Sequence, residues 1–170
     1  MRRPSILLGL ILLGLPLVQA IAWACGDKLM LVMNSRSSQI KPLHPAAILV
    51  YPGQSASAPL IRSLQSQAAF RKAGHRFQVV EDSTQLDNAL RAGKYDLVVA
   101  DVSDASELSE QVSASASKPV LLPVAFNASK EKQSAALKKY HCLLRAPGNT
   151  DNYLDAIDHA MELKLKGATR

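Results

Sequence analysis

Aromatic residues are scarce in this chain, and cysteines number only two. Phe, Trp and Tyr make up 5% of the 170 residues, whereas hydrophobic residues as a whole reach 48%. A core built mainly from Val, Leu, Ile and Ala is therefore expected, as in sheets covered by helices. A disulfide-rich scaffold is excluded, because two cysteines allow only one internal bridge.

Runs of one charge are also missing. The formal net charge is +6, but acidic and basic residues alternate, and no basic stripe is interleaved with aromatic residues. The composition therefore gives no support to nucleic-acid binding. The chain also contains no G-x-G-x-x-G, P-loop, C-x-x-C, H-E-x-x-H or G-x-S-x-G pattern. Because these motifs carry common phosphate, metal and hydrolase chemistry, we expect no enzyme, no metal site and no cofactor.

Residues 1–24 have the three parts of a secretory signal peptide. The positively charged start, MRR, precedes an uncharged apolar stretch over residues 6–18. Small residues then follow in A-x-A-like order up to Ala20 and Ala24. We predict cleavage after one of these alanines and a periplasmic or secreted location.

Two other fates of this segment stay open. Residues 6–24 are long enough to span a bilayer as an uncleaved anchor. Cys25 directly follows Ala24, so lipidation of Cys25 would instead give a lipoprotein. Either fate would tether the chain to a membrane, and all three fates place the folded domain outside the cytoplasm.

The two cysteines of the mature chain are Cys25 and Cys142. Outside the cytoplasm the redox conditions permit a disulfide between them. Such a bridge would tie the N-terminal arm to the domain and would stabilise the fold by about 4–5 kcal/mol in the chain-entropy model. The alternative is two free thiols, with Cys142 buried in a strand.

Residues 25–45 are expected to form an arm or linker, and residues 46–170 one α/β domain. In the domain, short apolar runs alternate with segments of helical periodicity. The expected strands cover residues 46–51, 75–80, 96–101, 119–124 and 141–144. The expected helices cover residues 58–73, 83–93, 105–114, 130–140 and 150–166.

Five strands alternating with five helices predict a doubly wound, five-stranded parallel sheet with helices on both faces. Right-handed crossovers favour this arrangement, and the expected strand order is 2-1-3-4-5. In such a sheet any site lies in the crevice outside the carboxyl ends of strands one and three.

Residues 85–101, QLDNALRAGKYDLVVAD, resemble the response-regulator receiver domains. In that family a helix, a Gly, a Tyr/Phe-Asp pair and an apolar strand lead to the phosphoacceptor aspartate, and Asp101 stands at its position. PVLL at 119–122 resembles the fourth strand, and LRAP at 144–147 resembles the lysine–proline pair after the fifth strand. The resemblance covers roughly residues 46–167 and implies a receiver-like, flavodoxin-like fold.

The sequence departs from receivers where their chemistry takes place. Receivers hold Mg²⁺ with an acidic pair after the first strand, because a hard cation prefers carboxylate oxygens. Here YPGQ occupies residues 51–54, and the expected hydroxyl residue after the fourth strand is replaced by Val124 or Ala125. Arg145 stands near the lysine position. The resemblance therefore implies a degenerate pseudo-receiver without phosphotransfer.

The turn after the first strand, PGQSAS at 52–57, is the weak candidate for ligand binding. It lies where phosphate-binding loops occur, and Gly53, Ser55, Ser57 and the free amides of the following helix can hold a small anion. Asp101, at the end of the third strand, faces the same crevice. The alternatives are a plain turn and helix cap, with Asp101 as a cap or loop carboxylate.

We therefore predict an exported, non-catalytic receiver-like module with an interaction or accessory signalling role and an unidentified protein partner. Receivers commonly signal through the face made by the fourth helix, fifth strand and fifth helix. The residues that the resemblance places there are Lys130, Lys132, Lys138, Lys139 and Tyr140. The alternative is a binder of a small anion or solute that resembles one lobe of a periplasmic solute-binding protein.

Overall fold

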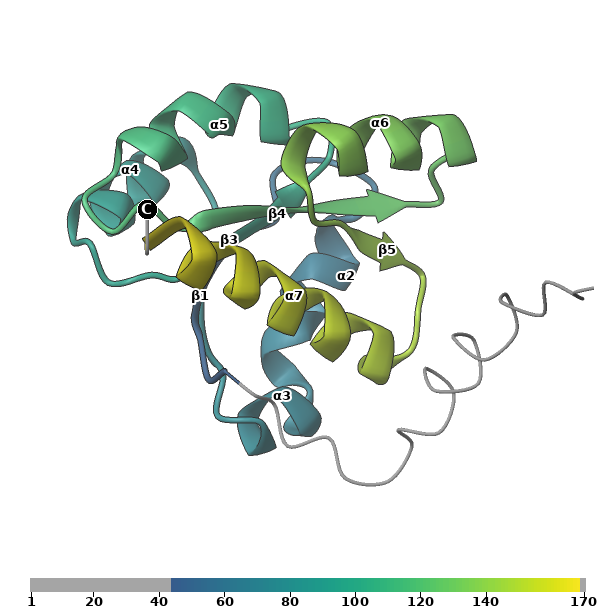
Figure 1. Cartoon of the computed structure of the whole chain (residues 1–170), viewed down its shortest axis with the longest axis horizontal. Coiled ribbons are helices and arrows are strands. Elements are labelled where there is room, and N and C mark those ends of the chain that lie inside the picture. Colours follow the sequence, from purple (N-terminus) through teal and green to yellow (C-terminus); the bar gives the residue numbers. More distant parts are fainter. Residues whose placement is uncertain (1–43, 169–170) are drawn as a thin grey trace, which may run out of the picture. The chain divides into compact units, whose positions relative to one another are not determined.

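Five parallel strands form one sheet in the order β2-β1-β3-β4-β5 (Figure 1). The computed structural model describes residues 44–168, so the predicted leader and residues 25–43 of the arm lie outside the described residues. The strands are β1 (Ala47–Tyr51), β2 (Arg76–Val79), β3 (Leu97–Asp101), β4 (Val120–Phe126) and β5 (Leu144–Ala146). The doubly wound fold and the predicted strand order are confirmed.

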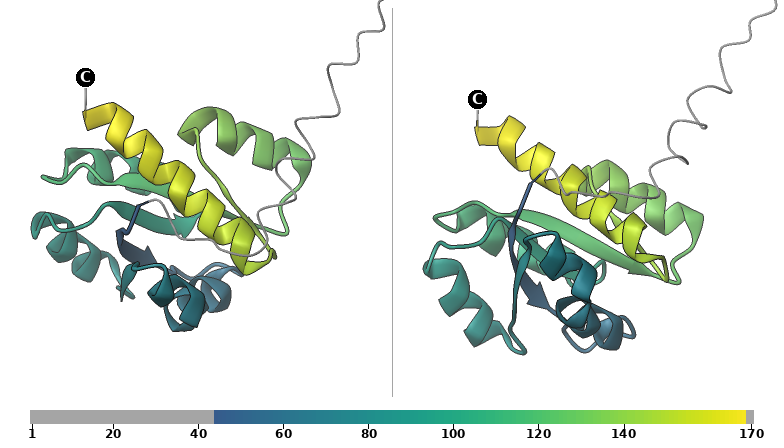
Figure 2. Two further views of the ribbon diagram at one scale, coloured as in Figure 1. Left: turned by 60° about the horizontal axis from the view of Figure 1, so that its bottom comes forward. Right: turned by 90° about the horizontal axis from the view of Figure 1, so that it is seen from below.

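Helices cover both faces of the sheet (Figure 2). They are α2 (Ala58–Ser63), the 3₁₀ turn η1 (Leu64–Ser66), α3 (Ala68–Lys72), α4 (Ser83–Arg91), α5 (Ala105–Ala114), α6 (Lys130–Tyr140) and α7 (Thr150–Ala168). The core clusters place α2, α3 and α7 on one face, and α4 and α5 on the other. A smaller cluster under α6 lies beside the end of β4.

The apolar run of β3 is buried along its whole length. Leu97 and Val99 pack into the core under α2, α3 and α7, whereas Val98 and Ala100 pack into the core under α4 and α5. Successive side chains of a strand point to opposite faces, so one continuous apolar run supplies both cores. This is why a continuous apolar run in the sequence was enough to identify β3 as a buried central strand.

The helix predicted over 58–73 is wrong as one element. The structure breaks it into α2, η1 and α3, and Gln67 has extended backbone angles (φ −71°, ψ 121°). The hydroxyls of Ser63 and Ser66 donate to the carbonyls of Leu60 and Ser63, and such local bonds compete with regular helix. The break changes which face is buried, so Phe70 enters the core and Ala68 is exposed.

The last two strands differ from the prediction at their ends. β4 continues to Phe126, and β5 begins at Leu144 instead of residue 141. His141 adopts a left-handed conformation (φ +61°) as the C-cap of α6, and its N–H donates to the carbonyl of Leu137. The prediction that His141 and Cys142 are neighbours within a strand is therefore wrong, because both precede β5.

The C-terminal helix α7 lies across the sheet and is tied to the start of β3. Lys164 Nζ lies 2.7 Å from Asp96 Oδ1, and Asp96 Oδ2 accepts a hydrogen bond from the N–H of Ala47 at 2.8 Å. One carboxylate thus joins α7, β3 and β1. Across residues 44–168, no helix combines the length and apolar character needed to cross a membrane.

Candidate functional site

The four residues predicted from the sequence meet beyond the carboxyl ends of β1 and β3. Gly53, Ser55 and Ser57 lie in the turn from β1 to α2, and Asp101 is the last residue of β3. β1 and β3 are paired neighbours, but the helices that follow them lie on opposite faces. Their ends therefore diverge at the topological switch point of the sheet.

The hydroxyl of Ser57 is the central contact of this site. Ser57 is fully buried, and its Oγ donates to Asp101 Oδ2. Ser55 Oγ lies 2.8 Å from Ser57 Oγ, so the two hydroxyls and the carboxylate form a chain. Ser57 also occupies the N-cap position of α2 but makes no side-chain cap bond.

The second carboxylate oxygen of Asp101 is occupied as well. The N–H and the hydroxyl of Ser103 donate to Asp101 Oδ1 at 2.9 and 2.8 Å. Burial raises the pKa of Asp101, but the hydrogen bonds from Ser57, Ser103 and Ser55 outweigh it and hold the pKa below its usual value. Asp101 is therefore an ionised carboxylate, and both of its oxygens accept hydrogen bonds from the surrounding turns.

Asp104 is a member of this site that the sequence analysis missed. It occupies the N-cap position of α5 without a side-chain cap bond, and its Oδ2 is buried with no hydrogen-bond partner. Burial, together with the nearby charges of Asp101 and Glu107, raises the pKa of Asp104. The available signal was its position, three residues after Asp101 in the same turn. We call Ser55, Ser57, Asp101, Ser103 and Asp104 the turn cluster.

Gly53 is required by the shape of the turn beside Asp104. Its φ of +60° lies in the left-handed region, and a Cβ at this position would collide with Asp104 Oδ2. Both conditions favour glycine. The role of Gly53 visible in the structure is therefore close packing of the β1–α2 turn against Asp104.

The structure also locates the residues at the other receiver positions. The end of β1 and the turn after it present Tyr51, Pro52 and Gly53 rather than carboxylates. Asp101 is paired in register with Val124 of β4. Arg145 is exposed, and its Nε donates to Gln133 of α6 at 3.2 Å. Among the residues from 44 to 168, no three His, Cys, Asp or Glu side chains come together in a way that could hold a metal ion.

Cys142 is fully buried just before β5. Its thiol lies 3.4 Å from the carbonyl oxygen of Leu121, and burial raises its pKa to about 12. Cys25 lies outside the described residues, so the predicted Cys25–Cys142 bridge stays a prediction.

The basic residues predicted as an interaction face lie on α6. The only buried side chain of this helix is Ala136, whereas Leu137 is 38% exposed. Lys139 Nζ lies 5.1 Å from the centre of the Tyr140 ring and donates to Ser106 Oγ of α5 at 3.0 Å. The other lysines of the predicted face are exposed: Lys130, Lys132 and Lys138. α6 thus presents a basic surface with one exposed leucine.

No family model and no curated protein matches the chain. Among solved structures, it is similar to NtrX from Brucella abortus, a protein that contains a response-regulator receiver domain and was crystallised in complex with ATP. The TM-score is 0.57 at 17% sequence identity, and the match covers 74% of this chain and 28% of the NtrX chain. The likeness establishes a receiver-like, flavodoxin-like fold.

Proposed function

We propose that this protein is an exported receiver-like module that acts by binding another protein and carries out no phosphotransfer. The observation that carries the proposal is the state of Asp101, which is 7% exposed and has both carboxylate oxygens bonded by Ser57 and Ser103. A phosphoacceptor must present an oxygen to its phosphodonor. Here that would require breaking buried hydrogen bonds, which is costly.

The charges around Asp101 support the same conclusion. Phosphoryl transfer relies on cations that neutralise the developing charge. Within residues 44–168, the hydrogen-bond donors to Asp101 are serines, and Arg145 is bonded to Gln133 instead. Asp104 adds a second carboxylate beside Asp101. The same two carboxylates disfavour an anion at Ser55 and Ser57, so protein interaction is favoured over anion binding.

The phosphotransfer part is tested by incubating the full chain with acetyl phosphate and Mg²⁺, followed by intact mass measurement. We expect no phosphoryl adduct under conditions that modify an active receiver used as the positive control. An adduct that disappears in Asp101→Asn would overturn this part of the proposal. The same incubation with Asp104→Asn controls for modification of the neighbouring carboxylate.

The interaction part places the partner on α6. Long lysine side chains on an exposed helix steer an acidic partner, and the exposed Leu137 supplies an apolar contact. Photocrosslinking from position 138, in cells that produce the protein, would capture such a partner. We expect capture to fall several-fold in Lys130→Glu/Lys132→Glu. It should persist in the matched double reversal Arg71→Glu/Lys72→Glu on α3. Equal capture in both variants would exclude α6 as the interface.

Export is tested independently of the interaction. A mass beginning at Ile21 or Cys25 for the protein isolated from its native cells would support cleavage of the predicted leader. A mass two hydrogens below the reduced value would in addition support the Cys25–Cys142 bridge. A lipid-sized addition on Cys25 or an uncleaved start would make the protein membrane-tethered.

A further inference from the structure

β2 is an edge strand with a regular row of outward backbone groups. It pairs with β1 on one side, and no strand within residues 44–168 pairs with its other side. The N–H groups of Arg76 and Val80 donate to carbonyls of Ala46 and Val50. Backbone groups alternate along a strand, so the N–H and C=O groups of Phe77 and Val79 point to the open side. Such an edge is a template for another strand.

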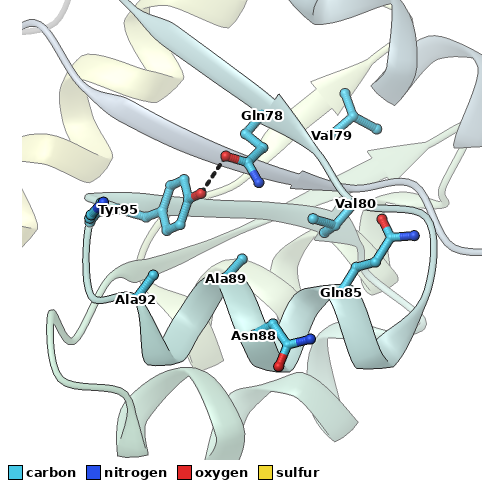
Figure 3. A pocket seen from close by; sticks show the side chains of 9 residues that line it. Gln78, Val79, Val80, Gln85, Asn88, Ala89, Ala92 and Tyr95 are labelled. Atoms are coloured by element: carbon cyan, nitrogen blue, oxygen red, sulfur yellow. Dashed lines mark hydrogen bonds between the residues drawn. The ribbon is translucent and has the colours of Figure 1, made fainter.

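Two hollows flank this strand. The larger one, about 470 Å³, lies between β2 and α4, and Figure 3 shows the mixed polar and apolar side chains that line it. The smaller one, about 230 Å³, lies at the start of β2. They share Gln78, Lys94 and Tyr95, and the hydroxyl of Tyr95 donates to Gln78 Oε1 at 2.6 Å. The edge therefore has room beside it for the side chains of an added strand.

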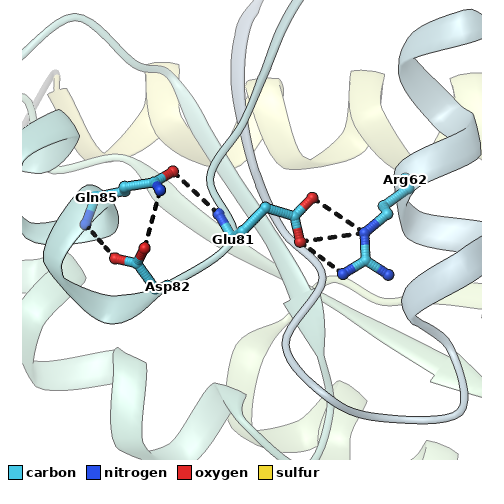
Figure 4. A network of polar contacts seen from close by, with 4 residues as sticks. All are labelled: Arg62, Glu81, Asp82 and Gln85. Atoms are coloured by element: carbon cyan, nitrogen blue, oxygen red, sulfur yellow. Dashed lines mark hydrogen bonds and ion pairs between the residues drawn. The ribbon is translucent and has the colours of Figure 1, made fainter.

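Charge is distributed unevenly along the β2 edge. Arg76 and Lys94 line the hollow at the start of the strand, and neither hollow has a carboxylate among its lining residues. Glu81 and Asp82 follow the end of the strand (Figure 4). Arg62 pairs with Glu81, and Asp82 caps α4 by accepting from Gln85 N. The start of the edge is therefore positive, and its end is net negative.

We propose that the β2 edge binds the β2 edge of a second copy of this chain, in antiparallel orientation about a twofold axis. An antiparallel copy brings the positive start of each edge alongside the negative end of the other. The same surface then serves both subunits, as a twofold dimer requires. The two sheets become one continuous ten-stranded sheet. This surface is separate from α6, so the dimer does not depend on the proposed interaction role.

The backbone groups select one register. Hydrogen-bonded pairs in an antiparallel ladder need outward groups on both strands. Pairing Phe77 with Val79 of the second copy satisfies the outward N–H and C=O groups of both residues in both copies. This register places Gln78 opposite Gln78 of the second copy as a non-hydrogen-bonded pair, with Cα atoms about 4.5 Å apart. Arg76 then lies opposite Val80 and diagonal to Asp82.

A cysteine crosslink tests this register directly. In a full chain carrying Cys25→Ser, we expect Gln78→Cys to form a covalent dimer on mild oxidation, because the Cα separation suits a disulfide. Glu81→Cys is the matched control. Two copies of position 81 lie about 20 Å apart in this register, so this variant should stay monomeric on a denaturing gel. Crosslinking of both variants at equal rates would overturn the register.

Charge reversal tests the pairing without altering the backbone. We expect Arg76→Glu to weaken the dimer about tenfold in sedimentation velocity, since like charges then face each other. Adding Asp82→Arg to the same chain should restore part of the affinity, because this register places position 82 of the second copy diagonal to position 76. A rescue of this kind separates a contact between subunits from a local structural effect. Arg145→Glu, on the exposed side of β5 at the opposite edge of the sheet, should leave dimerisation unchanged.

Two outcomes would overturn the proposal. One is a monomer at every concentration from low to high micromolar, with no dimer of Gln78→Cys after oxidation. The other is a dimer that neither Arg76→Glu nor Val79→Pro weakens. Val79→Pro removes one outward N–H, and proline is tolerated on the open side of an edge strand, so the variant should remain folded. Its circular dichroism melt checks this.

Discussion

The turn cluster and the β2 edge treat their polar groups in opposite ways. In the turn cluster, hydroxyls, one amide and the carboxylate of Asp101 bond to one another, and Ser57 and Asp101 are buried. At the β2 edge, the backbone groups of Phe77 and Val79 point outward and are flanked by hollows. The comparison teaches that the carboxylate at the phosphoacceptor position is bonded by its own neighbouring turns, whereas the outward groups of β2 have no strand partner within residues 44–168.

The largest expected effect comes from Asp101→Ala. Removal of this buried carboxylate leaves the Ser57 hydroxyl and the Ser103 N–H without their acceptor, so the free energy of unfolding should fall by about 3 kcal/mol. Urea unfolding of the full chain measures this, with the exposed Asp155→Ala as the control. A loss no greater than that of the control would mean that the turn cluster does not stabilise the fold.

Gly53→Ala should have the next largest effect. The added Cβ meets Asp104 Oδ2, and the positive φ disfavours any residue with a Cβ. We expect a loss of about 1–2 kcal/mol in the same urea experiment. When Gly53→Ala is combined with Asp104→Ala, the part of the stability loss that is caused by the collision should disappear. If the two losses simply add, the collision with Asp104 is not the cause.

The two regions should respond to acid in different pH windows. Burial lowers the pKa of His75, at the start of β2, although the charge of Asp158 opposes this shift. Stability that depends on neutral His75 is present above its unfolded pKa of about 6.5 and is lost as the pH falls below it. For Asp101, whose folded pKa is lowered, stability is present above about pH 3.9 and is lost as the pH falls through the folded pKa.

Melting temperatures between neutral and acidic pH separate these two windows. His75→Gln keeps an acceptor for the N–H of Ala46 but does not titrate. The plot of melting temperature against pH should therefore become flatter near pH 6, while its fall at acidic pH stays unchanged. Asp101→Asn should reduce the acidic limb alone. An unchanged slope near pH 6 in His75→Gln would assign that window to another group.

The smallest effect is expected for Arg62→Ala and Glu81→Ala at the end of the β2 edge. The two side chains form a 2.6 Å ion pair, but both are well exposed, and such pairs contribute little to stability. Neither single variant should change the melting temperature beyond experimental error. A clear drop of the melting temperature in both variants would mean that this ion pair stabilises the fold more than an exposed pair normally does.

The sheet could be predicted from the sequence because short apolar runs along the chain mark its strands. The apolar runs of β1 and β3 are continuous, and right-handed crossovers leave few possible strand orders. The same topology brought Ser57 and Asp101 to one crevice, as predicted. The break at Gln67 and the shift of β5 were not predictable in this way. They depend on serine–carbonyl bonds and on the left-handed turn at His141, where no glycine marks the end of the helix.

The site could be located but not described from the sequence. Ser103 and Asp104 carry no motif, and their roles follow from how closely the turn after β3 approaches the turn after β1. The hydrogen bond from the Ser57 hydroxyl to Asp101 is likewise a property of packing. Sequence patterns thus indicated which turns meet, whereas the hydrogen-bond partners depend on how closely these turns pack.

Because Cys142 is buried, the reactivity of its thiol measures how often the core of this protein opens. A thiol with a pKa near 12 and no access to solvent reacts with an alkylating reagent only after the surrounding core has separated. Wherever Cys142 carries a free thiol, its rate of labelling therefore counts excursions from the native state. A partner or a second copy that stabilises the domain would slow this labelling in proportion, without any engineered probe.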